Sequence, residues 1–184
     1  MKRLFDVFAS IFLLLLLAPL MLPVILAIKS YDGGPILFRQ CRIGRSGRKF
    51  MILKFRSMVV NANLIGAYST SYNDTRITPV GRFIRRFSID ELPQLLNVLK
   101  GDMSLIGPRP DVPEQRSLYS DSEWSIRHTV RPGITGLAQS TLRSDATPSQ
   151  RKALDLEYCQ RSSLFIDLKI IFWTCRQLLL KGGN

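Results

Sequence analysis

The sequence has few of the residues that build metal centres and disulfide frameworks. Its 184 residues include a single histidine, His128, and three cysteines without Cys-x-x-Cys spacing, Cys41, Cys159 and Cys175. One histidine excludes a multi-histidine metal centre, and three scattered cysteines indicate neither a zinc site nor a disulfide framework. The cysteine pattern is typical of a reducing compartment, and His128 is more typical of a structural residue than of a catalytic one.

Acidic residues are also scarce. The chain has 14 Asp and Glu against 26 Lys and Arg, which gives a formal net charge of +12. Such a field attracts anionic lipid headgroups, nucleic acid or phosphorylated substrates, and charge alone does not choose among them. A charged strand edge facing solvent or headgroups is the other interpretation of the arginines. Much of this charge lies in one span, opposed only by Asp32: Lys29, Arg39, Arg42, Arg45, Arg48, Lys49, Lys54 and Arg56.

Charge is absent from one long hydrophobic segment, residues 7–28. A straight helix of this length reaches roughly 33 Å, enough to cross a bilayer. A secretory signal peptide fits this run poorly, because the run is too long and lacks a small-x-small cleavage site before the charges resume. A chain of 184 residues therefore has room for one modest domain and a membrane element.

The hydrophobic segment is interrupted by Pro19 and Pro23, which predict a bend because each removes a helical hydrogen bond. Both flanks are basic, with Lys2-Arg3 before the segment and Lys29 after it. The positive-inside rule would keep both flanks in the cytoplasm, which a single spanning helix cannot satisfy. We therefore expect a re-entrant helix that bends at Ala18-Pro19, with a single-pass anchor as the alternative.

The middle of the chain alternates strand and turn signals. Residues 36–43 and 48–55 predict two strands joined at Gly44-Arg45-Ser46-Gly47 as a hairpin. Residues 61–75 are polar and predict a loop, and Thr78-Pro79 begins a short helix that ends at Arg86.

An adjacent pair of acids, Asp90-Glu91, lies among arginines in the next segment. Carboxylates among guanidinium groups suit a site that holds a phosphate and a divalent cation together. Ser88 to Glu91 also match a capping box, although Pro93 leaves open whether the helix begins at Ser88 or nearer Leu92. The surrounding arginines are Arg82, Arg85, Arg86 and Arg109.

Two further segments have the composition of stiff bends. Arg109 is held between Pro108 and Pro110, which suits a phosphate clamp, and a plain rigid turn is the alternative. The segment 131–136, Arg-Pro-Gly-Ile-Thr-Gly, repeats this design.

The C-terminal segment predicts an amphipathic helix over residues 164–180, with Ser163 as its cap. Its apolar face is broad and leaves a narrow polar strip of Asp167, Thr174 and Gln177. We expect an interfacial helix lying on the membrane, with a buried core helix as the alternative.

Sequence blocks along nearly the whole chain resemble the bacterial sugar transferases, the monotopic phosphoglycosyl transferase superfamily. The resemblance implies an enzyme that transfers a phosphosugar from a UDP-sugar to polyprenol phosphate at the cytoplasmic face of the bacterial inner membrane. The family has Ser-Pro where this chain has Ala18-Pro19. The blocks are Lys2-Arg3-Leu4-Phe5-Asp6, Lys54-Phe55-Arg56-Ser57-Met58, Asp90-Glu91-Leu92, Lys100-Gly101-Asp102-Met103-Ser104, Gly107-Pro108-Arg109-Pro110 and Val130-Arg131-Pro132-Gly133-Ile134-Thr135-Gly136.

The resemblance also implies roles for individual residues. Asp90 would be the nucleophile at the phosphorus bearing the sugar, and Glu91 would hold Mg²⁺. Arg85 and Arg109 would bind the phosphates, with a weaker correspondence at Arg143. Adjacent residues on a helix project about 100° apart, which agrees with separate roles for the two acids.

We therefore expect a small, mostly helical α/β domain: a re-entrant helix over residues 1–30 and a catalytic domain over 31–184 at the membrane interface. The expected partners are a UDP-sugar, polyprenol phosphate and membrane lipid, but not nucleic acid, and a homodimer is left open. The alternative function is a membrane-anchored basic module that binds anionic lipid or nucleic acid, which the acids at Asp90-Glu91 would weaken. The sequence names neither the sugar nor the pathway.

Overall fold

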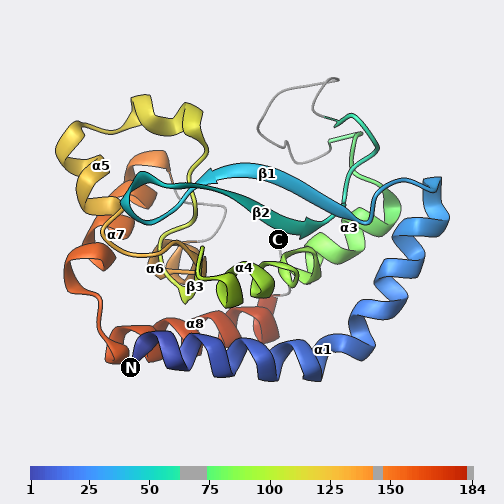
Figure 1. Cartoon of the computed structure of the whole chain (residues 1–184), viewed down its shortest axis with the longest axis horizontal. Helices are drawn as coiled ribbons and strands as arrows, with labels where there is room; N and C mark the ends of the chain where they lie inside the picture. Colours follow the sequence, from blue (N-terminus) through green and yellow to red (C-terminus); the bar gives the residue numbers. More distant parts are fainter. Residues whose placement is uncertain (63–73, 143–146, 182–184) are drawn as a thin grey trace.

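The computed structural model describes residues 1–62, 74–142 and 147–181, with side chains as far as residue 177. Helices dominate and the strands are short, which confirms the predicted small, mostly helical α/β domain (Figure 1). The α-helices and strands, with the 3₁₀ turns marked η, are α1 (Lys2–Asp32), β1 (Leu37–Ile43), η1 (Arg45–Gly47), β2 (Lys49–Phe55), α3 (Pro79–Arg86), η2 (Ile89–Glu91), α4 (Gln94–Lys100), β3 (Ser104–Ile106), η3 (Pro113–Leu118), α5 (Asp121–Arg127), β4 (Gly133–Thr135), α6 (Leu137–Thr141), α7 (Pro148–Arg161) and α8 (Leu164–Lys181).

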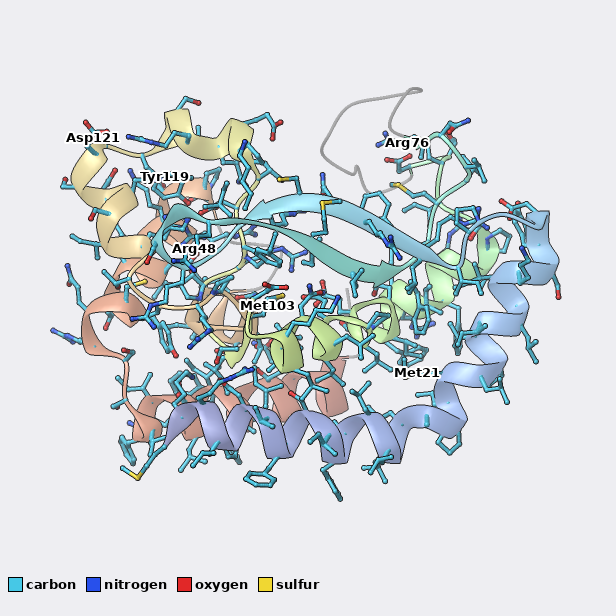
Figure 2. The ribbon with its side chains drawn as sticks, in the orientation of Figure 1. Met21, Arg48, Arg76, Met103, Tyr119 and Asp121 are labelled. Carbon is cyan, nitrogen blue, oxygen red and sulfur yellow. The ribbon has the colours of Figure 1, made fainter. Side chains whose placement is uncertain are left out.

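The hydrophobic segment forms the long helix α1, which includes Pro19 and Pro23. It runs along one edge of the molecule and then turns upward beside α3, with Met21 close to the bend (Figures 1 and 2). The predicted bend is therefore present, as a curve within one continuous helix. Of the helices described, α1 alone is long and apolar enough to cross a membrane by length and composition.

Both ends of α1 are attached to the same globular body. Near its start, Asp6 accepts hydrogen bonds from Ser104 Oγ at 2.9 Å and from the Leu105 main-chain nitrogen at 3.1 Å. Near its end, Val24 and Ile28 are buried in one core cluster with side chains of β2, α3 and η2. Because a straight spanning helix would carry one end away from the domain, this attachment agrees with a helix that returns to the same side.

The strands β1 and β2 form the predicted antiparallel hairpin, with Leu37 paired to Phe55 and Ile43 paired to Lys49. Each strand begins one residue later than predicted. The two faces of β2 enter different core clusters, since Ile52 packs with Val98 and Met103 and Phe55 packs with Ile84. The hairpin thus provides a rigid strand whose last residues lead into the candidate site.

Two basic residues at the end of the hairpin, Lys54 and Arg56, lie in the interior, whereas the strand arginine Arg39 is exposed, in agreement with a charged edge. Arg56 is buried and its guanidinium pairs with Asp32 at the end of α1. Lys54 is largely buried and pairs with Glu91. Buried cations need such partners because an unpaired charge in the interior is unfavourable.

A second, smaller sheet positions the proline-flanked bends. Its strands β3 and β4 are parallel, with Ser104 opposite Gly133 and Ile106 opposite Thr135. A Cβ atom on Gly133 would lie 2.1 Å from the main-chain nitrogen of Gly107, so the backbones approach as closely as glycine allows. This contact brings the 107–110 bend next to the 131–133 bend.

The C-terminal helix α8 begins after Ser163, as predicted, and Ser163 Oγ accepts from the Ile166 nitrogen at 3.3 Å. Its outer face exposes Phe165 and Phe172 by 66% and 64%, so it is not a buried core helix. Its polar strip faces the protein instead of water. Asp167 is buried and pairs with Lys2 at 2.6 Å.

Candidate active site

Helix α3 places Arg85 beside the end of β2. Thr78 caps the helix by accepting a hydrogen bond from the Gly81 nitrogen at 2.8 Å, with Pro79 in the first turn. Gly81 packs directly on Ser57, since a Cβ at residue 81 would lie 1.8 Å from the Ser57 carbonyl oxygen. In this position Arg85 Nε donates to Ser57 Oγ at 2.8 Å.

The predicted capping box at Ser88 does not form. Ser88 adopts a left-handed conformation, with φ at 55°, and its side chain caps nothing. A left-handed residue reverses the local direction of the chain between α3 and η2, so its hydroxyl does not face the nitrogens of the turn. Asp90 and Glu91 therefore lie in a 3₁₀ turn, and α4 begins only at Gln94, after Pro93. With three residues per 3₁₀ turn, adjacent side chains diverge by about 120°.

Glu91 is the centre of a small ionic cluster. Lys54 Nζ lies 2.6 Å from Glu91 Oε1, and Arg109 Nη2 lies 3.4 Å from the same oxygen. Burial would raise the pKa of Glu91, but Lys54 and Arg109 outweigh burial and hold the pKa at about 2. Glu91 is therefore ionised throughout the physiological range.

Asp90 has the opposite electrostatic environment. It is 8% exposed, and within the described residues its carboxylate receives no hydrogen bond. Burial and the charge of Glu91 raise its pKa to about 6, against the opposing effect of Lys54 and the nearby arginines. A desolvated carboxylate without donors is a better nucleophile than one held by hydrogen bonds.

Arg109 reaches the acids from the bend between Pro108 and Pro110. Its side chain is 41% exposed, so it remains accessible to a ligand while it contacts Glu91. Its main-chain carbonyl accepts from Arg127 Nη2 at 2.8 Å. Arg127 is fixed in turn by Asp111 and Asp155, each at 2.5 Å. A buried ion cluster thus supports the bend that presents Arg109.

The other predicted residues have mixed outcomes. The structure brings Arg85 and Arg109 to the side of the acids, whereas Arg143 lies outside the described residues. Arg131 Nε donates to the Gly101 carbonyl at 2.8 Å, which gives the 131–136 segment a structural contact. His128 is buried, and its Nδ1 lies 2.8 Å from the Trp124 carbonyl oxygen, in agreement with a structural residue.

A shallow hollow with room for about one water molecule opens beside Glu91. It lies between the hairpin and the two proline-flanked bends. Its lining includes basic side chains, one carboxylate, one amide and apolar side chains. The residues that line it are Arg42, Ile52, Lys54, Glu91, Gln94, Arg109, Pro110, Gly133 and Ile134.

Sequence reasoning missed Lys54, Arg42 and Gln94 as site residues. Lys54 belongs to the block Lys54-Phe55-Arg56-Ser57-Met58 that resembles the family, and its place in that block was the available signal. Arg42 was considered only as part of the basic span. No local pattern marked Gln94, because its place at the hollow depends on the packing of α4 against the hairpin.

The donors present fit Mg²⁺ only with help from a substrate. Among the described residues, no group of three or more His, Cys, Asp or Glu side chains is placed to hold a metal. Mg²⁺ commonly uses one or two carboxylates and completes its shell with water and substrate phosphates. Glu91 and its neighbour Asp90 meet that requirement, with Glu91 also held by Lys54 and Arg109.

Comparison with known proteins identifies the family of this chain. A model of the family described as bacterial sugar transferase matches residues 1–181. The chain belongs to this family. It is 43% identical to "Uncharacterized sugar transferase EpsL" of Bacillus subtilis, covering 100% of this chain and 89% of that protein.

Two longer relatives have names that state a reaction. The chain is 49% identical to "Undecaprenyl-phosphate glucose phosphotransferase" of Komagataeibacter xylinus, over 96% of this chain but only 35% of that protein. It is 46% identical to "UDP-glucose:undecaprenyl-phosphate glucose-1-phosphate transferase" of Caulobacter vibrioides, over 97% of this chain and 69% of that protein. The sequence thus spans about a third of the first relative and two thirds of the second.

Proposed function

We propose that this protein transfers a sugar phosphate from a UDP-sugar to polyprenol phosphate, forming a polyprenyl-diphosphate-sugar and UMP. The names of the two longer relatives support this reaction class. The observation that carries the proposal is the contrast between the adjacent acids. Asp90 is buried and, within the described residues, its carboxylate receives no hydrogen bond, whereas Lys54 and Arg109 keep Glu91 ionised. A binding module for anions would not need the first of these.

The proposed chemistry uses Asp90 as a nucleophile in two steps. Its carboxylate oxygen forms a bond to the phosphorus that bears the sugar, and the bond from that phosphorus to the oxygen of UMP breaks. UMP leaves with the electron pair, and the sugar phosphate remains on Asp90 as an acyl phosphate. An oxygen of polyprenol phosphate then attacks the same phosphorus and releases the Asp90 carboxylate.

The basic residues would stabilise the charge that develops on the phosphoryl oxygens. Arg109 is stiffly mounted, accessible and in contact with Glu91, so it would clamp the diphosphate. Arg85 is held by Ser57 on the side of α3 nearest the acids. Glu91 would hold Mg²⁺, which would supply Lewis-acid neutralisation of the diphosphate charge.

The membrane arrangement is also part of the proposal. We infer that α1 is re-entrant and that the domain lies on the cytoplasmic face of the inner membrane. The bend in α1 and its attachment to the domain at both ends support this arrangement. In this arrangement Asp90 would lie at the depth of the lipid headgroups, where the phosphate of a lipid and a soluble UDP-sugar can both reach it.

The direct test is UMP release from a panel of UDP-sugars by the full chain in detergent, with Mg²⁺ or EDTA. We expect release without polyprenol phosphate in amounts near one per protein, and retention of radiolabelled sugar phosphate on the protein. Asp90→Asn should abolish both signals. If wild-type protein releases UMP only after polyprenol phosphate is added and never retains label, transfer is direct. If it releases no UMP with any UDP-sugar and acceptor, the proposed function is wrong.

A further inference from the structure

The bend that presents Arg109 is held by hydrogen bonds from other parts of the chain. Pro108 and Pro110 have no main-chain N–H group, so neither can donate a hydrogen bond that would fix the bend. The carbonyl groups of residues 108 to 111 instead accept hydrogen bonds from distant segments. The direction in which the Arg109 guanidinium leaves the bend therefore depends on these donors.

Each of the four consecutive carbonyls accepts a hydrogen bond at 2.8 or 2.9 Å. Two of the donors are main-chain nitrogens, and a third, Arg127, belongs to the buried ion cluster. The fourth, Arg42, is a partly exposed side chain, so its removal should disturb the fold least. The pairs are the Gly133 nitrogen with Pro108, Arg127 Nη2 with Arg109, Arg42 Nη1 with Pro110, and the Ile43 nitrogen with Asp111.

The hairpin orients Arg42 toward the bend. Alternate residues of a strand share a face, and residues directly opposite each other in a hairpin do so too. By the register of β1 and β2, Arg42 and Gln40 lie on the same face as Lys54. Gln40 Oε1 accepts from Arg42 Nη2 at 2.7 Å, while Arg42 Nη1 donates to the Pro110 carbonyl at 2.9 Å. Arg39, on the other face of β1, is exposed.

We propose that Arg42 is a positioning residue that acts through Arg109. By holding the carbonyl of Pro110, the residue after Arg109, it fixes the direction of the Arg109 guanidinium toward Glu91 and the diphosphate of the donor. Misplacing a substrate-positioning group by about 1 Å can lower a rate by about a hundredfold, so such support matters for catalysis. This inference rests on the proposed function, since it takes Arg109 as a ligand of the diphosphate.

The test combines UMP release by the full chain in detergent with hydrogen exchange of the bend. Arg42→Met keeps an apolar stem and removes both donors. We expect kcat/KM to fall about tenfold, the size of one charged hydrogen bond, and the amides of residues 107–112 to exchange faster. Arg39→Met removes the same charge from the exposed face of β1, so it is the matched control and should change neither measurement.

A double-mutant cycle separates positioning from direct binding of the substrate. Arg109→Lys has already lost the planar guanidinium whose direction matters, so Arg42→Met should have little further effect on kcat/KM in that variant. An Arg42 that bound the diphosphate by itself would lower kcat/KM by the same factor with Arg109 or with Lys at that position. Additive effects of the two substitutions would therefore overturn the inference.

Unchanged UMP release or unchanged hydrogen exchange in Arg42→Met would also overturn it. If Arg42→Met fails to fold by its thermal transition, Arg42→Lys replaces it. This variant keeps the charge but cannot donate to Gln40 and Pro110 as a planar fork, so it should show both changes, and wild-type behaviour would contradict the proposal. If wild-type protein releases no UMP, the proposed function is wrong, and hydrogen exchange alone still decides whether Arg42 fixes the bend.

Discussion

Two adjacent carboxyl groups in one turn have pKa values on opposite sides of the usual range for acids. The pKa of Asp90 is raised to about 6, chiefly by burial. The pKa of Glu91 is held at about 2 because the charges of Lys54 and Arg109 outweigh the effect of burial. The divergence follows from different contacts: Glu91 pairs directly with Lys54 and Arg109, whereas the carboxylate of Asp90 is buried and receives no hydrogen bond within the described residues. Such a separation is what acid pairs with distinct chemical roles require.

The pH dependence of UMP release should report the ionisation of Asp90. A nucleophile must be deprotonated, so release should rise as the pH increases through about 6. Lys54 lowers the pKa of Asp90, so Lys54→Met should shift this rise to higher pH. Rate profiles at fixed Mg²⁺ measure the shift, and Lys100→Met at the exposed end of α4 is the control. A shift to lower pH would contradict the assignment.

The same ionisation should affect stability. The raised pKa of Asp90 means that its charged form destabilises the fold, an effect that is absent below about pH 4 and complete above about pH 6. Asp90→Asn should therefore be inactive yet more stable than wild type at pH 7.5, by about 3 kcal/mol. Denaturant unfolding at pH 7.5 and pH 4 measures this gain, which should vanish at the lower pH. A variant that is inactive and less stable at both values would indicate a structural role.

Arg109 should depend on its planar guanidinium as well as on its charge. Arg109→Lys keeps the charge but loses the two parallel donors that match a phosphate, so kcat/KM should fall about tenfold or more. Arg161→Lys, on the exposed end of α7, changes the same residue type away from the site and should have no effect. Unchanged kinetics for Arg109→Lys would remove Arg109 from the site.

At the scale of elements, the site depends on how closely α3 approaches the end of β2. Gly81 is in contact with the main chain of Ser57, and only a residue without a Cβ allows that approach. The contact is what places Arg85 against the Ser57 hydroxyl at 2.8 Å. The same principle applies where Gly107 and Gly133 let the two proline-flanked bends approach each other.

Gly81→Ala should therefore affect both stability and activity. Inserting a methyl group 1.8 Å from a carbonyl oxygen forces α3 away, which should cost about 2 kcal/mol of unfolding free energy. The displaced Arg85 should lower the rate of UMP release. Ser57→Ala removes the hydroxyl and keeps the helix in place, so it should lower activity with little loss of stability. Equal stability of Gly81→Ala and wild type would show that the helix yields without cost.

At the scale of the whole molecule, the two apolar helices α1 and α8 run along the same edge in Figure 1. Lys2 of α1 and Asp167 of α8 are paired at 2.6 Å, which joins them. Many large apolar side chains of both helices are exposed, among them Phe8, Leu15, Phe165 and Phe172. Exposed apolar surface of this extent is typical of contact with a membrane or another protein.

Re-entry predicts that both ends of the chain lie on one side of the membrane. Protease-cleavable tags at Met1 and at Asn184 should both be protected, or both be cleaved, in sealed inner-membrane vesicles of a given orientation. Opening the vesicles with detergent should expose both tags and serves as the control. Protection of one tag with cleavage of the other would show that α1 spans the bilayer.

The sequence by itself determined the elements and the family. The bend in α1, the hairpin and the start of α3 follow from prolines, glycines and caps that act locally, so short-range patterns predict them. The acids at Asp90-Glu91 were likewise visible as a motif. The place of these acids at the N-terminal end of a helix was also predicted. The capping box at Ser88 was wrong, because Ser88 has a left-handed backbone conformation between α3 and η2 and its side chain makes no capping hydrogen bond.

Only the tertiary structure decided what the acids contact and which side chains face inward. Lys54 is 37 positions from Glu91 in the chain, and Arg109 approaches from a separate bend. Arg56 and Asp167 are charged residues that lie in the interior, where Arg56 pairs with Asp32 and Asp167 pairs with Lys2. Charge and polarity show that a side chain needs a partner or water, but not which one. Long-range packing makes that choice, and with it the two different pKa values on which the proposed chemistry depends.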